Sequence, residues 1–134
     1  MTATSVSSVR VRYAETDQMG ITYHGVYFVW FEVARVDFIR ARGLSYRDLE
    51  QKEDLRLPVI EAEARFLKPS YYDDVLEIRT RLLEMSGARI RFEYEVHREG
   101  TEGALATGRT GHAAVDGKGR VRRFPEALRR SLSA

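Results

Sequence analysis

The stretch between residues 13 and 27 holds the side chains best suited to chemistry. Asp17 stands in the turn-rich piece Glu-Thr-Asp-Gln-Met-Gly, and His24 follows it in Tyr-His-Gly. An aspartate has an ordinary pKa of about 3.9, so at neutral pH it can act as a nucleophile or deprotonate a water. The chain has no cysteine and no Gly-x-Ser-x-Gly elbow, so within this turn Glu15 is the one alternative to Asp17.

The histidines do not indicate a metal centre. His24, His97 and His112 are far apart in the sequence, and none stands in an H-x-x-x-H or two-histidine-plus-carboxylate pattern. Cysteine ligands are absent. We therefore expect neither a bound metal nor a cofactor.

One long helix must position these residues. Residues 24–42 contain no proline and are closed by Gly43, a common signal for the end of a helix. Apolar side chains lie nearly all round it, which is typical of a buried helix. A half-buried strand is predicted before it, over Val6–Tyr13, where Val9, Val11 and Tyr13 alternate with polar residues.

The second half of the chain has the period of two that strands show. Apolar and polar residues alternate over residues 59–66, 76–82 and 90–96, with turn residues between these runs. Residues 105–115, rich in alanine, glycine and threonine, are predicted to form a fourth strand of this half. Strands joined by short turns usually pair with their neighbours in sequence. The pattern predicts an α+β fold, with a curved antiparallel sheet of about five strands wrapped around one long buried helix. Short helices are predicted at Tyr46–Lys52, capped by Ser45, and at Pro125–Leu132.

Three motifs together resemble one enzyme family. They are Thr-Asp-x-x-Gly at residues 16–20, Tyr-His at residues 23–24, and Phe-Glu-x-Ala-Arg at residues 31–35. In this order the chain resembles the acyl-CoA thioesterases of the hotdog fold, in the 4-hydroxybenzoyl-CoA thioesterase group and its YbgC-like branch. The strand order and the Phe-Leu-Lys-Pro segment at residues 66–69 extend the likeness over nearly the whole chain.

The resemblance implies roles for particular residues. Asp17 would be the nucleophile or general base, and His24 would position the substrate or stabilise the leaving thiolate. Free N–H groups near the helix start would polarise the thioester oxygen. Tyr23, Gly25 and Tyr27 are the expected substrate-binding residues near this point, and Lys68, Arg89 and Arg91 are candidates for binding the CoA nucleotide.

The resemblance also implies partners and an assembly. The expected substrate is an acyl-CoA or an acyl carrier protein thioester, and water is the second reactant. Hotdog thioesterases form homodimers whose sheets join edge to edge, and often homotetramers, with the active site between two subunits. Such pairing would cover the exposed edges of a small open sheet.

Composition bounds the remaining possibilities. A chain of 134 residues with 43% hydrophobic residues is long enough for one domain over residues 1–134 with its own core. The charges are mixed, with 22 basic and 20 acidic residues, so no nucleic-acid partner is indicated. We expect residues 1–7 to be disordered, and we expect no signal peptide, no membrane span and a cytoplasmic location.

Two other functions remain open from the sequence alone. A hotdog hydratase or dehydratase would also act on acyl thioesters, but its histidine and acidic residue stand at a different spacing. A non-catalytic module could bind acyl thioesters without cleaving them. The presence of both Asp17 and His24 favours hydrolysis over either alternative.

Overall fold

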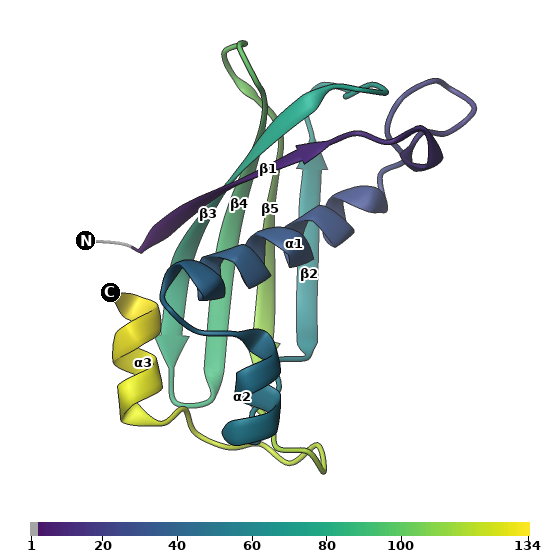
Figure 1. The fold of residues 1–134 in the computed structure, drawn as a ribbon. Helices are drawn as coiled ribbons and strands as arrows, with labels where there is room; N and C mark the ends of the chain where they lie inside the picture. The colour runs from purple at the N-terminus through teal and green to yellow at the C-terminus, as the bar shows by residue number, and fades with distance from the viewer. Residues whose placement is uncertain (1–2) are drawn as a thin grey trace.

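The computed structural model describes residues 3–134. One long helix, α1 (Val26–Ala41), crosses one face of a five-stranded antiparallel sheet, as Figure 1 shows. This curved sheet around a helix confirms the predicted α+β hotdog architecture. The strands are β1 (Thr4–Arg10), β2 (Val59–Phe66), β3 (Val75–Ser86), β4 (Arg89–Arg98) and β5 (Ala104–Ala113), and the short elements are η1 (Tyr13–Glu15), α2 (Tyr46–Lys52) and α3 (Glu126–Ser133).

The strand order in space is β1-β3-β4-β5-β2. The predicted pairing of neighbours is confirmed for β3 with β4 and for β4 with β5, and is wrong for β2. β2 pairs with β5 at one edge of the sheet, and β1 takes the place beside β3. The reason lies in residues 67–74, which form a crossing connection instead of a tight turn. Leu67 donates from its amide to the carbonyl of Leu105, and Ser70 accepts from the amide of Thr22.

The start of the chain also differs from the prediction. Residues 4–7 were expected to be disordered, and instead they form the first part of β1, with Thr4 opposite Arg81 and Ser7 opposite Ile78. Residues 1 and 2 lie outside the described part of the chain. Threonine and serine side chains gave no apolar alternation here, but strand pairing uses backbone groups, and the free edge of β3 supplies them.

Aromatic rings join α1 to the sheet. Phe31 stacks on Tyr94 with ring centroids 4.4 Å apart, and Phe38 meets the ring of Phe92 edge-on at 5.3 Å. A Cβ atom at Gly108 would lie 2.4 Å from the ring of Phe31. The glycine therefore allows α1 to approach β5 closely, which fixes the height of the helix above the sheet.

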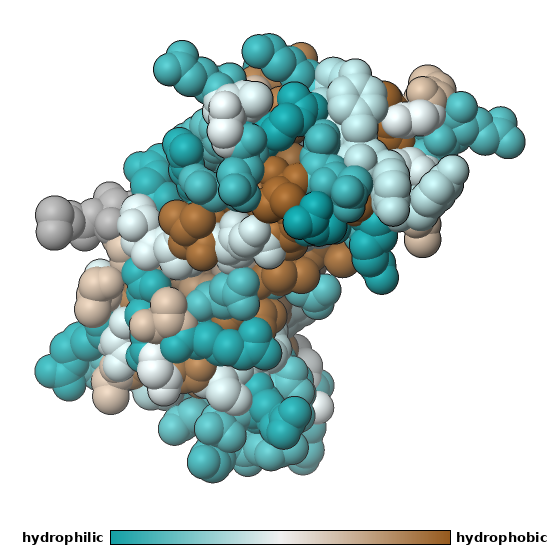
Figure 2. Space-filling view, turned by 45° about the horizontal axis from the view of Figure 1, so that its top comes forward, coloured by the Kyte–Doolittle hydropathy of each residue, from teal (hydrophilic) through white to brown (hydrophobic). Residues whose placement is uncertain are grey.

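Part of the apolar surface has no cover within one chain. Val29 and Val33, on the side of α1 that faces away from the sheet, are 53% and 38% exposed. β2 is exposed along almost its whole length and forms one edge of the sheet. Figure 2 shows brown apolar patches among polar groups on the side of the molecule that carries α1.

Candidate active site

A pocket of about 360 Å³ opens at the start of α1. The turn that carries Asp17 forms one wall, and residues 66–69, at the end of β2 and just after it, form the other. The pocket brings together four of the residues predicted from the sequence, namely Asp17, His24, Tyr27 and Lys68. Segments far apart in the chain thus meet at one point.

A tight turn fixes the carboxylate of Asp17. Its Oδ1 accepts from the amide of Met19 at 2.8 Å, and its carbonyl accepts from the amide of Gly20 at 2.9 Å. Gly20 has φ +79°, a backbone conformation that glycine adopts without strain. Within residues 3–134, Oδ2 of Asp17 has no hydrogen-bond partner. One carboxylate oxygen therefore holds the turn while the other stays free for chemistry.

Glu15, the alternative acid, uses its carboxylate to bind Arg12. Its side chain is buried, and Oε1 accepts from the amide of Arg12 at 2.7 Å. The Arg12 guanidinium lies 3.4 Å from its other carboxylate oxygen. Glu15 does not line the pocket. Of the two acidic candidates, only Asp17 faces the space that a substrate could occupy.

The start of α1 offers two unpaired amides. The amide of Tyr23 donates to the carbonyl of Glu15 at 2.9 Å, and the amide of Val26 donates to the carbonyl of Tyr23 at 3.0 Å. Between them, the amides of His24 and Gly25 have no acceptor within the part of the chain that the structure describes. Free N–H groups at a helix start attract negative charge, and the helix dipole adds to the effect.

Aromatic rings surround these amides. The ring of His24 packs between Tyr23, at 4.4 Å, and Phe66, at 6.2 Å, measured between ring centroids. A Cβ atom at Gly25 would lie 2.9 Å from the ring of Tyr23, so glycine is what lets this ring lie against the helix start. The Tyr27 ring meets Phe66 edge-on at 5.1 Å. The pocket therefore combines an apolar wall with a free carboxylate.

Tyr27 presents its ring to the pocket and not its hydroxyl. The hydroxyl lies 2.8 Å from Oγ of Ser70, which is fully buried. Burial raises the pKa of Tyr27 above its ordinary value, and the Ser70 contact offsets this only in part. Ser70 and its neighbour Thr22 were missed by the sequence reasoning. A single serine after a proline carries no periodic signal that would mark it as buried.

The two arginines predicted for nucleotide binding, Arg89 and Arg91, lie away from this pocket, toward the other end of the sheet. Arg89 begins β4 and pairs with Ala113, whereas the pocket lies beside Phe66, which pairs with Ala106 at the other end of β5. The guanidinium of Arg91 lies 3.5 Å from a carboxylate oxygen of Glu61 and 3.3 Å from one of Glu84. A single chain therefore does not bring these arginines to Asp17.

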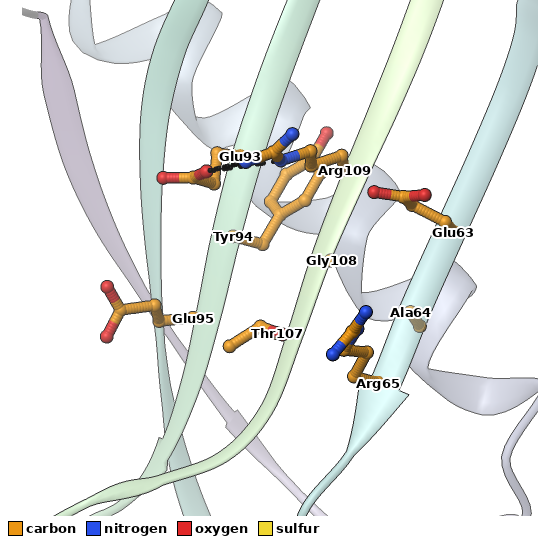
Figure 3. Close-up of a pocket in the computed structure, with 9 residues that line it drawn as sticks. All are labelled: Glu63, Ala64, Arg65, Glu93, Tyr94, Glu95, Thr107, Gly108 and Arg109. Carbon is orange, nitrogen blue, oxygen red and sulfur yellow. Dashed lines mark hydrogen bonds and ion pairs between the residues drawn. The ribbon is translucent and has the colours of Figure 1, made fainter.

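A larger hollow, of about 480 Å³, lies on the opposite face of the sheet from α1 (Figure 3). Glu93 is one of the residues that line it, and it accepts hydrogen bonds from Arg81 and Arg109. The hydrogen bond from Arg81 is the main reason that the pKa of Glu93 is lowered. The carboxylate of Glu93 is therefore held in ion pairs, unlike the free Oδ2 atom of Asp17 in the pocket at α1.

Two further features bear on the class of protein. Within residues 3–134, no group of three or more histidine, cysteine, aspartate or glutamate side chains is placed to hold a metal ion. Among the helices of that same part, none combines the length and apolar character that crossing a bilayer requires.

Comparisons with known proteins agree with this geometry. The family described as the thioesterase-like superfamily matches residues 11–132. A putative acyl-CoA thioesterase, YneP, from Bacillus subtilis is 35% identical over 84% of this chain and 80% of its own length. The acyl-CoA thioesterase YbgC from Haemophilus influenzae is 31% identical over 90% of this chain and 88% of its own. A crystal structure of a hypothetical protein from Thermus thermophilus is 45% identical, with a TM-score of 0.90, over 96% of this chain and 97% of that one.

Proposed function

This chain belongs to the thioesterase-like superfamily, and we propose that it is an acyl-CoA thioesterase in which Asp17 acts as nucleophile or general base. It cleaves the thioester bond to give a free acid and CoA. The observation that carries the role of Asp17 is its free Oδ2 atom in a pocket at the start of α1, where the amides of His24 and Gly25 are unpaired within the described residues.

Two routes use the same residues. As a nucleophile, Asp17 attacks the thioester carbon and expels the CoA thiolate, and water then hydrolyses the resulting anhydride. As a general base, Asp17 takes a proton from the water that attacks the thioester carbon, and the tetrahedral intermediate collapses with loss of the thiolate. In both routes negative charge develops on the former carbonyl oxygen. The amides of His24 and Gly25 are the donors that would stabilise that charge.

The remaining pocket residues hold the substrate. The rings of Tyr27 and Phe66 contact the acyl group. Tyr23 packs against the ring of His24, which lies where it can position the thioester or stabilise the leaving thiolate. Lys68, at the rim, is suited to the anionic CoA arm.

The active unit is a homodimer, or a homotetramer built from dimers, in the cytoplasm. The exposed edge strand β2 and the uncovered Val29 and Val33 support an assembly of this kind. Each chain contributes one domain over residues 1–134, and acyl carrier protein thioesters are a second class of substrate. Arg89 and Arg91 of the partner chain would then bind the CoA nucleotide.

The test is an assay of hydrolysis on a panel of acyl-CoAs and acyl carrier protein thioesters, in which the free thiol released is measured. We expect Asp17→Asn to lower kcat by at least about 100-fold, the usual scale for loss of an acid–base group, and to leave the fold intact. Glu15→Gln is the matched control, because it makes the same change at the acid that faces away from the pocket, and it should keep most of the turnover.

Other outcomes would overturn the proposal. Tight binding of acyl-CoA with no thiol release would identify a binding module instead. Addition or loss of water in the acyl chain, with the thioester intact, would identify a hydratase or dehydratase. Full turnover by Asp17→Asn together with inactivity of Glu15→Gln would move the catalytic role to Glu15.

A further inference from the structure

Three buried hydroxyl groups form a chain beneath the pocket. Oγ of Ser70 lies 2.8 Å from the hydroxyl of Tyr27 and 2.6 Å from Oγ1 of Thr22. Oγ1 of Thr22 also donates to the backbone carbonyl of Ser70 at 3.2 Å. The exposed fractions of Ser70, Thr22 and Tyr27 are 0%, 5% and 3%, so solvent does not compete for these bonds.

One set of bond directions lets every hydroxyl in the chain donate once. In it the Thr22 hydroxyl donates to the backbone carbonyl of Ser70. Ser70 then donates to Thr22, and Tyr27 donates to Ser70. Ser70 is the centre of this chain of hydroxyls, because it contacts both of the others.

The two residues that Ser70 holds stand on either side of the unpaired amides. Thr22 ends the turn that begins at Asp17, and Tyr27 lies in the first turn of α1, while His24 and Gly25 lie between them. A backbone bond from the Thr22 amide to the Ser70 carbonyl, at 2.8 Å, strengthens the first attachment. Ser70 itself follows Pro69, in the opposite wall of the pocket.

From this arrangement we propose that Ser70 is a positioning residue, which sets the amides of His24 and Gly25 relative to Asp17. The inference rests on the proposed thioesterase function and adds a residue to it. Ser70 touches neither substrate nor the reacting atoms. It acts by fixing both ends of the short segment that carries the oxyanion donors, and donors of this kind are effective only when they are held in place before the reaction.

The chain offers a matched control for loss of a buried hydroxyl. Thr110 is also buried, and its Oγ1 lies 2.7 Å from the hydroxyl of Tyr94 and 2.8 Å from Nε2 of His112. Thr110→Val and Ser70→Ala therefore each remove one hydroxyl that joins a buried tyrosine to a second polar group. Thr110 does not line the pocket at α1.

The experiment compares kcat, KM and melting temperature for these two variants with the unaltered chain on one acyl-CoA. We expect both variants to melt at a lower temperature. Ser70→Ala should lower kcat about tenfold or more with KM changed less than about threefold, since displaced donors weaken transition-state binding. Thr110→Val should keep kcat within about twofold at a temperature where it is folded.

A double-mutant cycle separates positioning from direct contact. If Tyr27 acts through Ser70, the double variant should lose no more kcat than Ser70→Ala alone, and Tyr27→Phe should lose that much or less, because Ser70 also holds Thr22. If the Tyr27 hydroxyl acts on the substrate by itself, the losses should multiply, and the proposed role of Ser70 would be wrong.

Two results distinguish this inference from the proposed function. Turnover by the unaltered chain with unchanged kcat in Ser70→Ala, or an equal loss of kcat in Thr110→Val, would overturn the role of Ser70 alone. Absence of thioester hydrolysis by the unaltered chain would overturn the proposed function and the role of Ser70 together.

Discussion

Asp17 divides its two carboxylate oxygens between structure and chemistry. A turn residue that accepts from the backbone two positions later is common, and Oδ1 of Asp17 does so with Met19. That contact fixes the orientation of the Asp17 side chain, so the position of its free Oδ2 atom in the pocket is fixed as well. The structural and catalytic interpretations of this residue are therefore compatible, and each supports the other.

His112 is the residue whose titration should govern acid stability. It is 1% exposed, its Nδ1 donates to the carbonyl of Leu57, and its Nε2 accepts from Thr110. Burial, with a smaller contribution from the positive charge of Arg35, lowers the pKa of His112 from 6.5 to about 4. The folded chain therefore holds this ring neutral at a pH where the unfolded chain already binds a proton.

The sign of the pH dependence follows. The stabilisation is fully present above the unfolded pKa of 6.5 and is lost as pH falls toward and through 4. We expect the free energy of unfolding to fall by about 3 kcal/mol from this group between neutral pH and pH 4. Urea unfolding at several pH values measures it. His112→Gln should be less stable at pH 7 and should show a shallower slope, and an unchanged slope would contradict this assignment.

At the scale of elements, the approach of α1 to β5 depends on one glycine. Because a Cβ atom at position 108 would lie 2.4 Å from the ring of Phe31, and because that ring stacks on Tyr94, the ring cannot move aside freely. The helix itself would have to shift. Since α1 carries the amides of the active site near its start, such a shift would also reach the pocket.

We therefore expect Gly108→Ala to cost about 1–3 kcal/mol in stability, the usual range for overpacking a core, and to lower kcat as well. Gly111→Ala on the same strand is the control. There the new Cβ atom would meet the side chain of Glu61, whose exposed carboxylate end can swing away. Thermal unfolding of both variants tests the difference, and equal losses would show that the ring of Phe31 is not the cause.

The elements differ in how far the sequence predicts them. The long helix α1, which ends two residues before Gly43, and the pairing of β3 with β4 follow from local signals, namely a helix-ending glycine and a short turn at Ser86 and Gly87. The place of β2 does not, because its partner β5 is distant in sequence and no local pattern encodes that pairing. Ser70 was missed for a related reason, since its burial depends on Thr22 and Tyr27, far away in the chain.

The same distinction holds for the site. Asp17, His24 and Tyr27 lie within one short stretch, and the motifs there were sufficient to bring them together. Lys68 reaches the same pocket from the connection that follows β2. Arg89 and Arg91 were chosen by charge and strand position alone, and neither property says at which end of the sheet a residue lies.

At the scale of the whole molecule, the question is what covers β2. An antiparallel pairing of β2 with β2 of a second copy would be two-fold symmetric, as most homodimers are. It would place the Val59 end of the partner beside the Phe66 end of the first chain. The Val59 end lies near Ile90, since both pair with His112, so the partner's Arg89 and Arg91 would move toward the first chain's pocket.

A shared site of this kind makes a prediction that no single chain could satisfy. Asp17→Asn should abolish turnover, and the double variant of Arg89→Gln and Arg91→Gln should raise KM for acyl-CoA while sparing an acyl-pantetheine that lacks the nucleotide. If the two defects lie on opposite chains of one site, each mixed dimer contains one intact site and one site with both defects. Equal mixing after unfolding and refolding should therefore restore about one site in four to normal kcat and KM.

Light scattering on the same mixture should report a dimer or tetramer, and the substrate dependence should resolve a component with the KM of the unaltered chain. Salt should weaken the effect of the arginine changes, because exposed charges are screened over about 8–10 Å at ordinary ionic strength. Within the described chain Arg89 has no carboxylate partner, whereas Arg91 contacts Glu61 and Glu84, so Arg89→Gln alone should give the larger share of the change in KM. If the activity of the mixture equals the sum of the activities of the two separate variants, each pocket binds the nucleotide with residues of its own chain. Lys68 would then be the first residue to substitute in a search for those that bind the nucleotide.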